Sequence, residues 1–170
     1  TVYGGVAGDV MGQDCQKIKA LHDPDETVLD EELARAVAPF AQKPGDLAAL
    51  RDRLQDVMWE DVGVMRDADG LQRGLQRIAE IDDELSSLGV AADNLAFNLS
   101  WHDWLNIRSL VDMSTVIAKA ALSRENSRGA HFREDFPDAG AMQESYFTLA
   151  TGHGEAISVS RAPVQFTIVK

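Results

Sequence analysis

The chain has 170 residues, 45% of them hydrophobic, and its 16 basic and 28 acidic residues give a formal net charge of −12. A chain of this length can bury one respectable core, and a negative charge without a Lys/Arg stripe argues against nucleic-acid binding. Cys15 is the single cysteine, which excludes an internal disulfide and is compatible with a reducing cytosol. No apolar run approaches membrane-spanning length, so we expect no direct membrane insertion.

Residues 1–20 carry a glycine pattern that favours a helix with one bare face. Gly4, Gly8 and Gly12 follow at four-residue spacing, which would let another backbone approach closely. The alternative is a glycine-rich leader without regular structure. The spacing matches neither G-x-G-x-x-G nor the lysine-bearing phosphate loop. The sequence begins at Thr1 without a methionine or a signal-peptide pattern, so we expect a piece of a longer chain.

Residues 21–45 are interpreted as an acidic linker that packs but does no chemistry. Three prolines interrupt it, and acidic residues outnumber basic ones. One short helix is predicted over residues 28–38, led by Asp25 or Thr27 and stopped by Pro39.

Residues 46–127 predict a mainly α fold, an up-down-up bundle of three helices. Asp46 suits the N-cap of the first helix, and apolar residues follow it at helical spacing. Gly63 interrupts this pattern and is predicted to mark a tight helix crossing. The DADG stretch at 67–70 is predicted to be the turn or bend between the first two helices.

The second helix is predicted over residues 71–88, with Gly89 as its C-cap. The third, over residues 100–126, is apolar on most sides. Because two amphipathic helices would not cover such an element, we expect a further surface to pack against it.

Residues 128–170 predict a segment that fastens the helix end, followed by a β-hairpin tail. Strand-like runs at 146–150 and 156–160 flank a glycine-containing turn, and residues 164–169 form a possible third strand after Pro163. A hairpin alone is marginal in water, so we expect it to lean on another element.

The titratable residues predict no catalytic, cofactor-binding or metal site. His22 and His153 are interpreted as surface residues, and His102 lies beside Trp101 at the start of the third helix. No histidine pair has helical metal-site spacing, and one cysteine cannot anchor zinc. Acidic residues on the amphipathic helices are interpreted as solvated faces rather than paired catalytic acids; these are Asp61, Asp82, Asp83 and Glu84.

The stretch SRGAHFREDFP, residues 127–137, concentrates charged side chains directly after the third helix. Arginines near a helix C-terminus favour its carbonyl end, and Gly129 can take the left-handed cap conformation. His131 and Arg133 are then free to bond carboxylates or exposed carbonyls. A structural clasp explains the whole stretch without a substrate, and we favour it over a catalytic site. The charges balance: Arg124, Arg128 and Arg133 stand against Glu125, Glu134 and Asp135.

LSRENSRGAHFREDFP resembles a segment near the end of succinate dehydrogenase and fumarate reductase flavoprotein subunits. Residues 50–78 are similar to the first two C-terminal helices of that family, LNIRSLVDMSTVIAKAAL to its third, and residues 144–167 to its tail. TVYGGVAGDVMG looks like the end of its flavin-binding domain. Asn126 departs from the glutamate that is common there. The matched positions include Met58, Gly63, Arg66, Arg124, Ser127, Arg128, Gly129, Ala130, His131, Arg133, Asp135 and Pro137.

The resemblance implies an enzyme that moves a hydride between flavin N5 and a dicarboxylate. The family's bundle is described as spectrin-repeat-like. Its dinucleotide glycines, flavin-attachment histidine, substrate-binding residues and proton-donating arginine precede the point where this sequence starts. We therefore expect FAD to be bound by a missing N-terminal domain, and the fragment alone to be inactive.

The expected partners are that FAD-binding domain and an iron–sulfur subunit. We expect the protein to be cytoplasmic and to lie peripherally on the cytoplasmic face of the inner membrane. Two other interpretations stay open: the same domain of an L-aspartate oxidase-like flavoenzyme, or a stand-alone helical interaction module.

Overall fold

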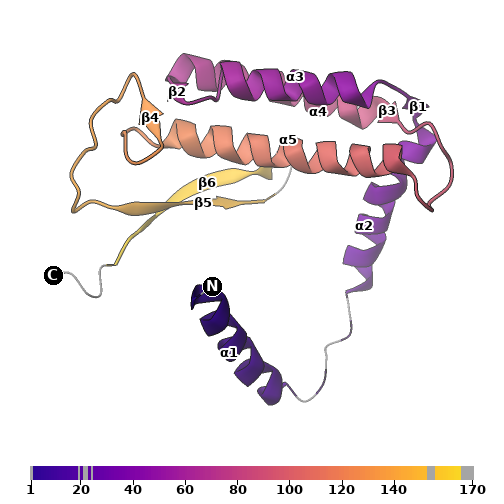
Figure 1. Ribbon diagram of the computed structural model, residues 1–170, viewed down its shortest axis with the longest axis horizontal. Helices are drawn as coiled ribbons and strands as arrows, with labels where there is room; N and C mark the ends of the chain where they lie inside the picture. Colours follow the sequence, from indigo (N-terminus) through magenta and orange to yellow (C-terminus); the bar gives the residue numbers. More distant parts are fainter. Residues whose placement is uncertain (1, 19, 21–22, 24, 153–155, 166–170) are drawn as a thin grey trace. The chain divides into compact units, whose positions relative to one another are not determined.

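The computed structural model describes residues 2–18, 20, 23, 25–152 and 156–165 (Figure 1). The chain divides into two units between residues 36 and 37. The first unit contains α1 (Val2–Lys17) and most of α2 (Glu26–Val37). The glycine-patterned segment is therefore helical. A Cβ on Gly4, Gly8 or Gly12 would meet nothing within 4 Å.

Helix α2 begins two residues before the predicted start, and Asp25 leads it. The Oδ1 of Asp25 accepts the backbone N–H of Thr27 at 3.0 Å. Pro39 lies in the 3-10 turn η1 (Ala38–Ala41), so the helix ends before that proline, as predicted. No side chain of α2 is buried.

The second unit is built on three helices, α3 (Leu47–Glu60), α4 (Ala68–Ser87) and α5 (Leu99–Ser123), which run side by side (Figure 1). This confirms the mainly α bundle. Each helix starts on a side-chain cap that accepts a backbone N–H three residues later: Asp46 from Ala49 at 3.0 Å, Asp67 from Gly70 at 2.6 Å, and Asn98 from Trp101 at 3.0 Å.

The core lies between the three helices, where apolar side chains repeat at helical spacing. It is continuous from α3 to α5 and includes Leu50, Leu54, Val57, Leu71, Ile78, Ile81, Leu85, Trp104, Ile107, Val111 and Ala118.

Two short parallel pairings fasten the connections of the bundle. Strand β1 (Lys43–Pro44) pairs with β3 (Leu88–Gly89), and β2 (Met65–Arg66) pairs with β4 (Phe132–Arg133). The second pairing joins the α3–α4 connection to the segment that follows α5.

The tail is an antiparallel hairpin of β5 (Tyr146–Thr151) and β6 (Ser158–Pro163). It packs on α5, where Lys119 Nζ donates to the carbonyl of Ile157 at 2.7 Å, so the expectation that it leans on another element is confirmed. Strand β6 runs on through Pro163, three residues beyond the predicted end. Val164 and Gln165 are not in a strand. Residues 166–169 of the predicted third strand lie outside the described residues.

Gly63 does not mark a helix crossing, and that prediction was wrong. It follows the end of α3, and a Cβ on it would lie 2.4 Å from the carbonyl oxygen of Trp59. The close helix contact is at Gly74 in α4, whose Cβ would lie 2.9 Å from Val62 Cγ2 and 3.0 Å from Asp61 Cβ.

Two further details of the α4 boundaries differ from prediction. The DADG stretch is the N-cap and first turn of α4, because the Asp67 side chain caps the helix there. The C-cap of α4 is Leu88, one residue before the predicted Gly89, and Gly89 is not among the residues with positive φ. Its Cβ would lie 2.2 Å from the carbonyl oxygen of Gln42, and the β1–β3 pairing therefore requires a glycine.

Candidate functional site

Residues 124–137, called the clasp below, lie where α5 ends and β2 passes (Figure 1). The clasp begins at Arg124, the C-cap of α5, and includes β4. Glu134 N–H donates to the carbonyl of Arg66 at 2.7 Å, which continues the β2–β4 pairing. The charged residues singled out in the sequence are thus held beside the ends of two helices.

Arg133 is the most buried charged residue of the clasp, with 1% of its surface exposed. The last carbonyls of a helix lack intrahelical partners and carry the negative end of its dipole. A guanidinium group there satisfies them, as predicted. Its Nη1 donates to the carbonyls of Ala121 at 3.0 Å, Leu122 at 3.1 Å and Arg124 at 3.2 Å.

Asp135 connects this guanidinium to α4. Its two oxygens accept from Nε and Nη2 of Arg133, each at 2.7 Å, and Oδ2 also accepts the backbone N–H of Ala68 at 3.0 Å. The hydrogen bonds from Arg133 are the first cause that lowers the pKa of Asp135 to about 2, and the Ala68 N–H adds to it. The C-terminal end of α5 and the first turn of α4 are therefore joined through one ion pair.

His131 lies between Arg66 of β2 and the end of α5. Its Nδ1 is 3.0 Å from Arg66 Nη1, and its Nε2 is 3.2 Å from the carbonyl oxygen of Arg124. Arginine can only donate and a carbonyl can only accept, so the ring is neutral with its proton on Nε2. Burial lowers the pKa of His131, and the nearby Arg66, Arg124 and Arg133 lower it further.

A tight turn shapes the middle of the clasp. Arg128 and His131 exchange backbone hydrogen bonds at 2.9 and 3.1 Å, and Gly129 between them has φ +60°. The left-handed conformation predicted for Gly129 is confirmed, but it serves this turn and not the helix end. The Ser127 hydroxyl accepts the N–H of Arg133 at 2.9 Å and lies 2.8 Å from the carbonyl of Phe136.

Two arginines of the clasp hold the chain that follows. Arg128 Nη2 donates to the carbonyl of Ala141 at 2.7 Å, and its Nη1 to Ser145 Oγ at 3.2 Å. Arg124 lies 4.8 Å from the ring centroid of Tyr146, a cation–π contact, and donates to Thr148 Oγ1 at 3.1 Å. These contacts are those of a clasp; that none of the residues is catalytic stays a prediction.

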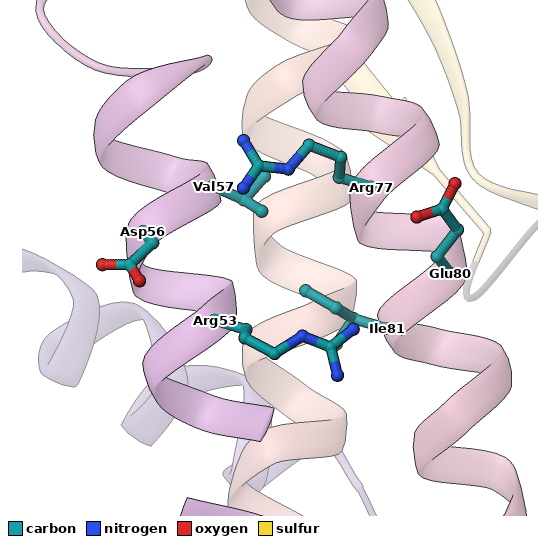
Figure 2. Close-up of a pocket in the computed structure, with 6 residues that line it drawn as sticks. All are labelled: Arg53, Asp56, Val57, Arg77, Glu80 and Ile81. Atoms are coloured by element: carbon teal, nitrogen blue, oxygen red, sulfur yellow. The ribbon is translucent and has the colours of Figure 1, made fainter. Parts of the chain in front are cut away.

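Charged side chains also converge at a shallow hollow between α3 and α4 (Figure 2). Arg53 and Arg77 extend across it from opposite helices, and both are paired, Arg53 with Glu84 at 2.6 Å and Arg77 with Glu60 at 2.8 Å. The hollow is lined by Arg53, Asp56, Val57, Arg77, Glu80 and Ile81. Its cations serve to bridge two helices.

Asp61 is not a solvated residue, which corrects the prediction. It is 4% exposed, and its carboxylate accepts from Arg73 Nε at 2.9 Å and Arg77 Nη1 at 2.7 Å. The arginines stand four residues apart on one face of α4, a signal that sequence reasoning missed. Of residues 82–84, Asp83 is exposed, while Asp82 pairs with Arg108 and Glu84 with Arg53.

The remaining histidines add no site. His102 is exposed on α5, with its ring centroid 6.0 Å from that of Trp101. His22 and His153 lie outside the described residues. Within the described part of the chain, no cluster of histidine, cysteine and acidic side chains is arranged to hold a metal. No helix in that same part is both long and apolar enough to cross a membrane.

Comparison with known proteins places this architecture in a family. The model of the fumarate reductase flavoprotein C-terminal family matches residues 51–170. An uncharacterized FAD-dependent oxidoreductase of Methanocaldococcus jannaschii is 31% identical over 137 residues, which are 78% of this chain and 24% of that protein. L-aspartate oxidase 1 of Ralstonia nicotianae is 40% identical over 86 residues, which are 51% of this chain and 15% of that protein.

A solved structure agrees with the sequence relatives. Mycobacterium smegmatis Sdh1 in complex with UQ1 is 27% identical with a TM-score of 0.75, and the match covers 91% of this chain and 27% of that one. The chain thus spans about a quarter or less of the length of the proteins it matches. It belongs to the fumarate reductase flavoprotein C-terminal family and is a C-terminal region of a succinate dehydrogenase/fumarate reductase-type flavoprotein subunit.

Proposed function

We propose that this chain is the helical support of an FAD-dependent oxidoreductase, whose flavin exchanges a hydride with a dicarboxylate such as succinate or fumarate outside these 170 residues. The family match and the relative described as FAD-dependent support the redox class. The contacts of the clasp support the scaffold role, because Arg124, Arg128 and Arg133 are occupied by acceptors of the chain itself.

The observation that carries the proposal is an apolar stripe on α5 that the described residues of the second unit leave exposed. Leu110, Met113 and Ile117 follow at helical spacing and are 43%, 55% and 41% exposed. Helix α5 already packs on α3, α4 and the hairpin with its other sides. An apolar face left over after this packing is typical of an element that another domain covers.

In the same proposal, α1 packs against the FAD-binding domain, and each part of the chain has its own role. Tyr3, Val6 and Val10 of α1 are exposed beside its glycines. Residues 1–20 then belong to the FAD-binding domain and 21–45 to a linker. Residues 46–127 form the bundle, and 128–170 form the end of the clasp with its tail.

FAD, in this proposal, is held by the N-terminal domain and by no residue of this chain. An iron–sulfur subunit accepts the electrons, and the assembly lies on the cytoplasmic face of the inner membrane. The similarity to Sdh1 in complex with UQ1 supports a flavoprotein that works with further electron carriers.

L-aspartate oxidation is the second candidate, because the Ralstonia L-aspartate oxidase has 40% identity over half of the chain. Succinate oxidation and L-aspartate oxidation both remove a hydride from a C4 dicarboxylate, and the bundle is compatible with either reaction. The residues that would distinguish them lie in the domain outside this chain.

The test is to express the whole polypeptide from its gene and assay it three ways. We expect bound FAD, succinate oxidation with an artificial electron acceptor, and fumarate reduction with a reduced dye. If L-aspartate is the only substrate that reacts, and its oxidation releases hydrogen peroxide, the second candidate is supported instead. A polypeptide that begins near residue 1 and binds no flavin would instead favour a stand-alone interaction module.

A further inference from the structure

The charge state of the His131 ring determines which contacts it can make within the clasp. The ring joins Arg66, in the connection between α3 and α4, to the last carbonyl of α5 at Arg124. It is half-buried, and its backbone forms the Arg128–His131 bridge. A change at this ring therefore reaches both the turn of the clasp and its pairing with β2.

The contact with Arg66 requires a neutral ring. Arg66 Nη1 donates to the lone pair of Nδ1, and protonation would replace that lone pair with a second donor. The hydrogen bond would then become a contact between two cations. The other bond, from Nε2 to the Arg124 carbonyl, survives protonation, so the charge change acts on the β2 side alone.

The charged groups that face the ring oppose protonation from three directions. They are Arg66 from β2, Arg124 at the end of α5, and Arg133 from β4. Asp135 is held by both Nε and Nη2 of Arg133 and by the Ala68 N–H. Arg66 is fixed on its other side, because its Nε donates to the carbonyls of Val62 at 3.0 Å and Gly63 at 2.6 Å.

We propose that His131 is an acid-sensitive latch, which holds the clasp against β2 while neutral and releases it from β2 when protonated. The ion pair of Arg133 with Asp135 keeps the end of α5 tied to α4 during this release. The part that opens is the pairing of Arg66 and Glu134 together with the turn at 128–131. An acidic medium would thus loosen the connection between the bundle and its tail without unfolding the core.

The direction of the pH effect follows from the lowered pKa of the folded state. An unfolded histidine takes up its proton near pH 6.5, while the folded His131 takes it up at a lower pH. The unfolded chain therefore binds more protons in this window. Stability from His131 is complete above about pH 6.5 and is lost as the pH falls through the folded pKa.

The test combines two mass-spectrometric measurements on purified protein that carries residues 1–170. Exchange of the imidazole C2 hydrogen against pH gives a separate pKa for each histidine, and backbone amide exchange reports the protection of residues 124–141. His131→Asn keeps an acceptor for Arg66 but cannot titrate. The matched control is His102→Asn, which removes an exposed histidine from α5.

We expect the pKa of His131 to lie below the ordinary value of 6.5, and Arg66→Gln to raise it. Protection of residues 124–141, corrected for intrinsic exchange, should fall on acidification in the wild type and in His102→Asn but not in His131→Asn. The proposal is overturned if the pKa of His131 lies at or above the ordinary 6.5, or if the segment keeps its protection after His131 is protonated. The titrations need only the wild-type protein, so they test the proposal even if the His131→Asn variant does not fold.

Discussion

Arg133 and Asp135 form a bidentate ion pair that bridges the ends of two helices. Each carboxylate oxygen lies 2.7 Å from a guanidinium nitrogen, and the remaining Nη1 of Arg133 reaches the terminal carbonyls of α5. Asp135 also accepts the N–H of Ala68, in the first turn of α4. The cation thus lies at the negative end of one helix dipole and the anion at the positive end of another, where each is favoured.

Replacing Arg133 by Met should strongly destabilise the second unit. The substitution keeps most of the volume but leaves the α5 carbonyls and Asp135 without their buried donor, and we expect a loss of about 3 kcal/mol in the free energy of unfolding. Urea unfolding followed by circular dichroism measures it. The matched control is Arg53→Met, whose pair with Glu84 is 50% and 42% exposed and should cost about 1 kcal/mol or less. Equal losses in the two variants would contradict the clasp.

Asp135→Asn should remove an acid-sensitive part of the stability. The folded pKa of about 2 lies below the ordinary 3.8, so the unfolded chain binds more protons between these values. The stability that Asp135 contributes is therefore complete above the ordinary pKa and is lost as the pH falls toward 2. Unfolding free energies from about pH 6 to about pH 3 should show the wild type and the variant converging. A difference that stays constant over this range would show that the carboxylate gains nothing from Arg133.

Gly89→Ala should destabilise the β1–β3 pairing. The new Cβ would lie 2.2 Å from the carbonyl oxygen of Gln42 and 2.6 Å from that of Pro39, and backbone atoms cannot move aside cheaply. We expect a loss of about 1 to 3 kcal/mol, measured by thermal unfolding. Gly8→Ala in α1 is the control, because its Cβ meets nothing within 4 Å, and it should raise helicity slightly. A Gly89→Ala variant that is as stable as the wild type would contradict the close approach of residue 89 to the Gln42 and Pro39 carbonyls.

Phe97→Asn should stabilise the isolated chain. Phe97 has φ 55° and is fully exposed, so its side chain gives nothing in return for a left-handed backbone. Asparagine tolerates that conformation better, and we expect a gain of about 0.5 to 1 kcal/mol in urea unfolding. Leu95→Asn tests the effect of polarity alone, because Leu95 is 60% exposed without a positive φ. If both variants gain equally, backbone strain is not the cause.

The sequence was most informative where the cause is local. The cap at Asp46 depends on a side chain and an N–H three residues away, and the stop before Pro39 depends on a missing N–H. The preference of Arg133 for terminal carbonyls follows from charge at a helix end, so it too could be predicted from residue type.

Most of the failures have a non-local cause. A glycine in the sequence does not show whether, or which, atom lies close to it, so the predictions of a helix crossing at Gly63 and a C-cap at Gly89 were both wrong. Asp61 was placed in solvent because its partners Arg73 and Arg77 lie on the next helix. The two-residue pairings β1–β3 and β2–β4 are too short to leave a periodic signal, and their partners lie far apart in the chain.

The proposal that flavin chemistry takes place outside this chain can be tested with one spectrum. The isolated 170-residue protein is incubated with excess FAD, passed through a desalting column and examined for visible flavin absorbance. We predict a colourless protein without bound FAD. A yellow protein that retains FAD in stoichiometric amount would contradict the scaffold role and would place the cofactor site among these residues.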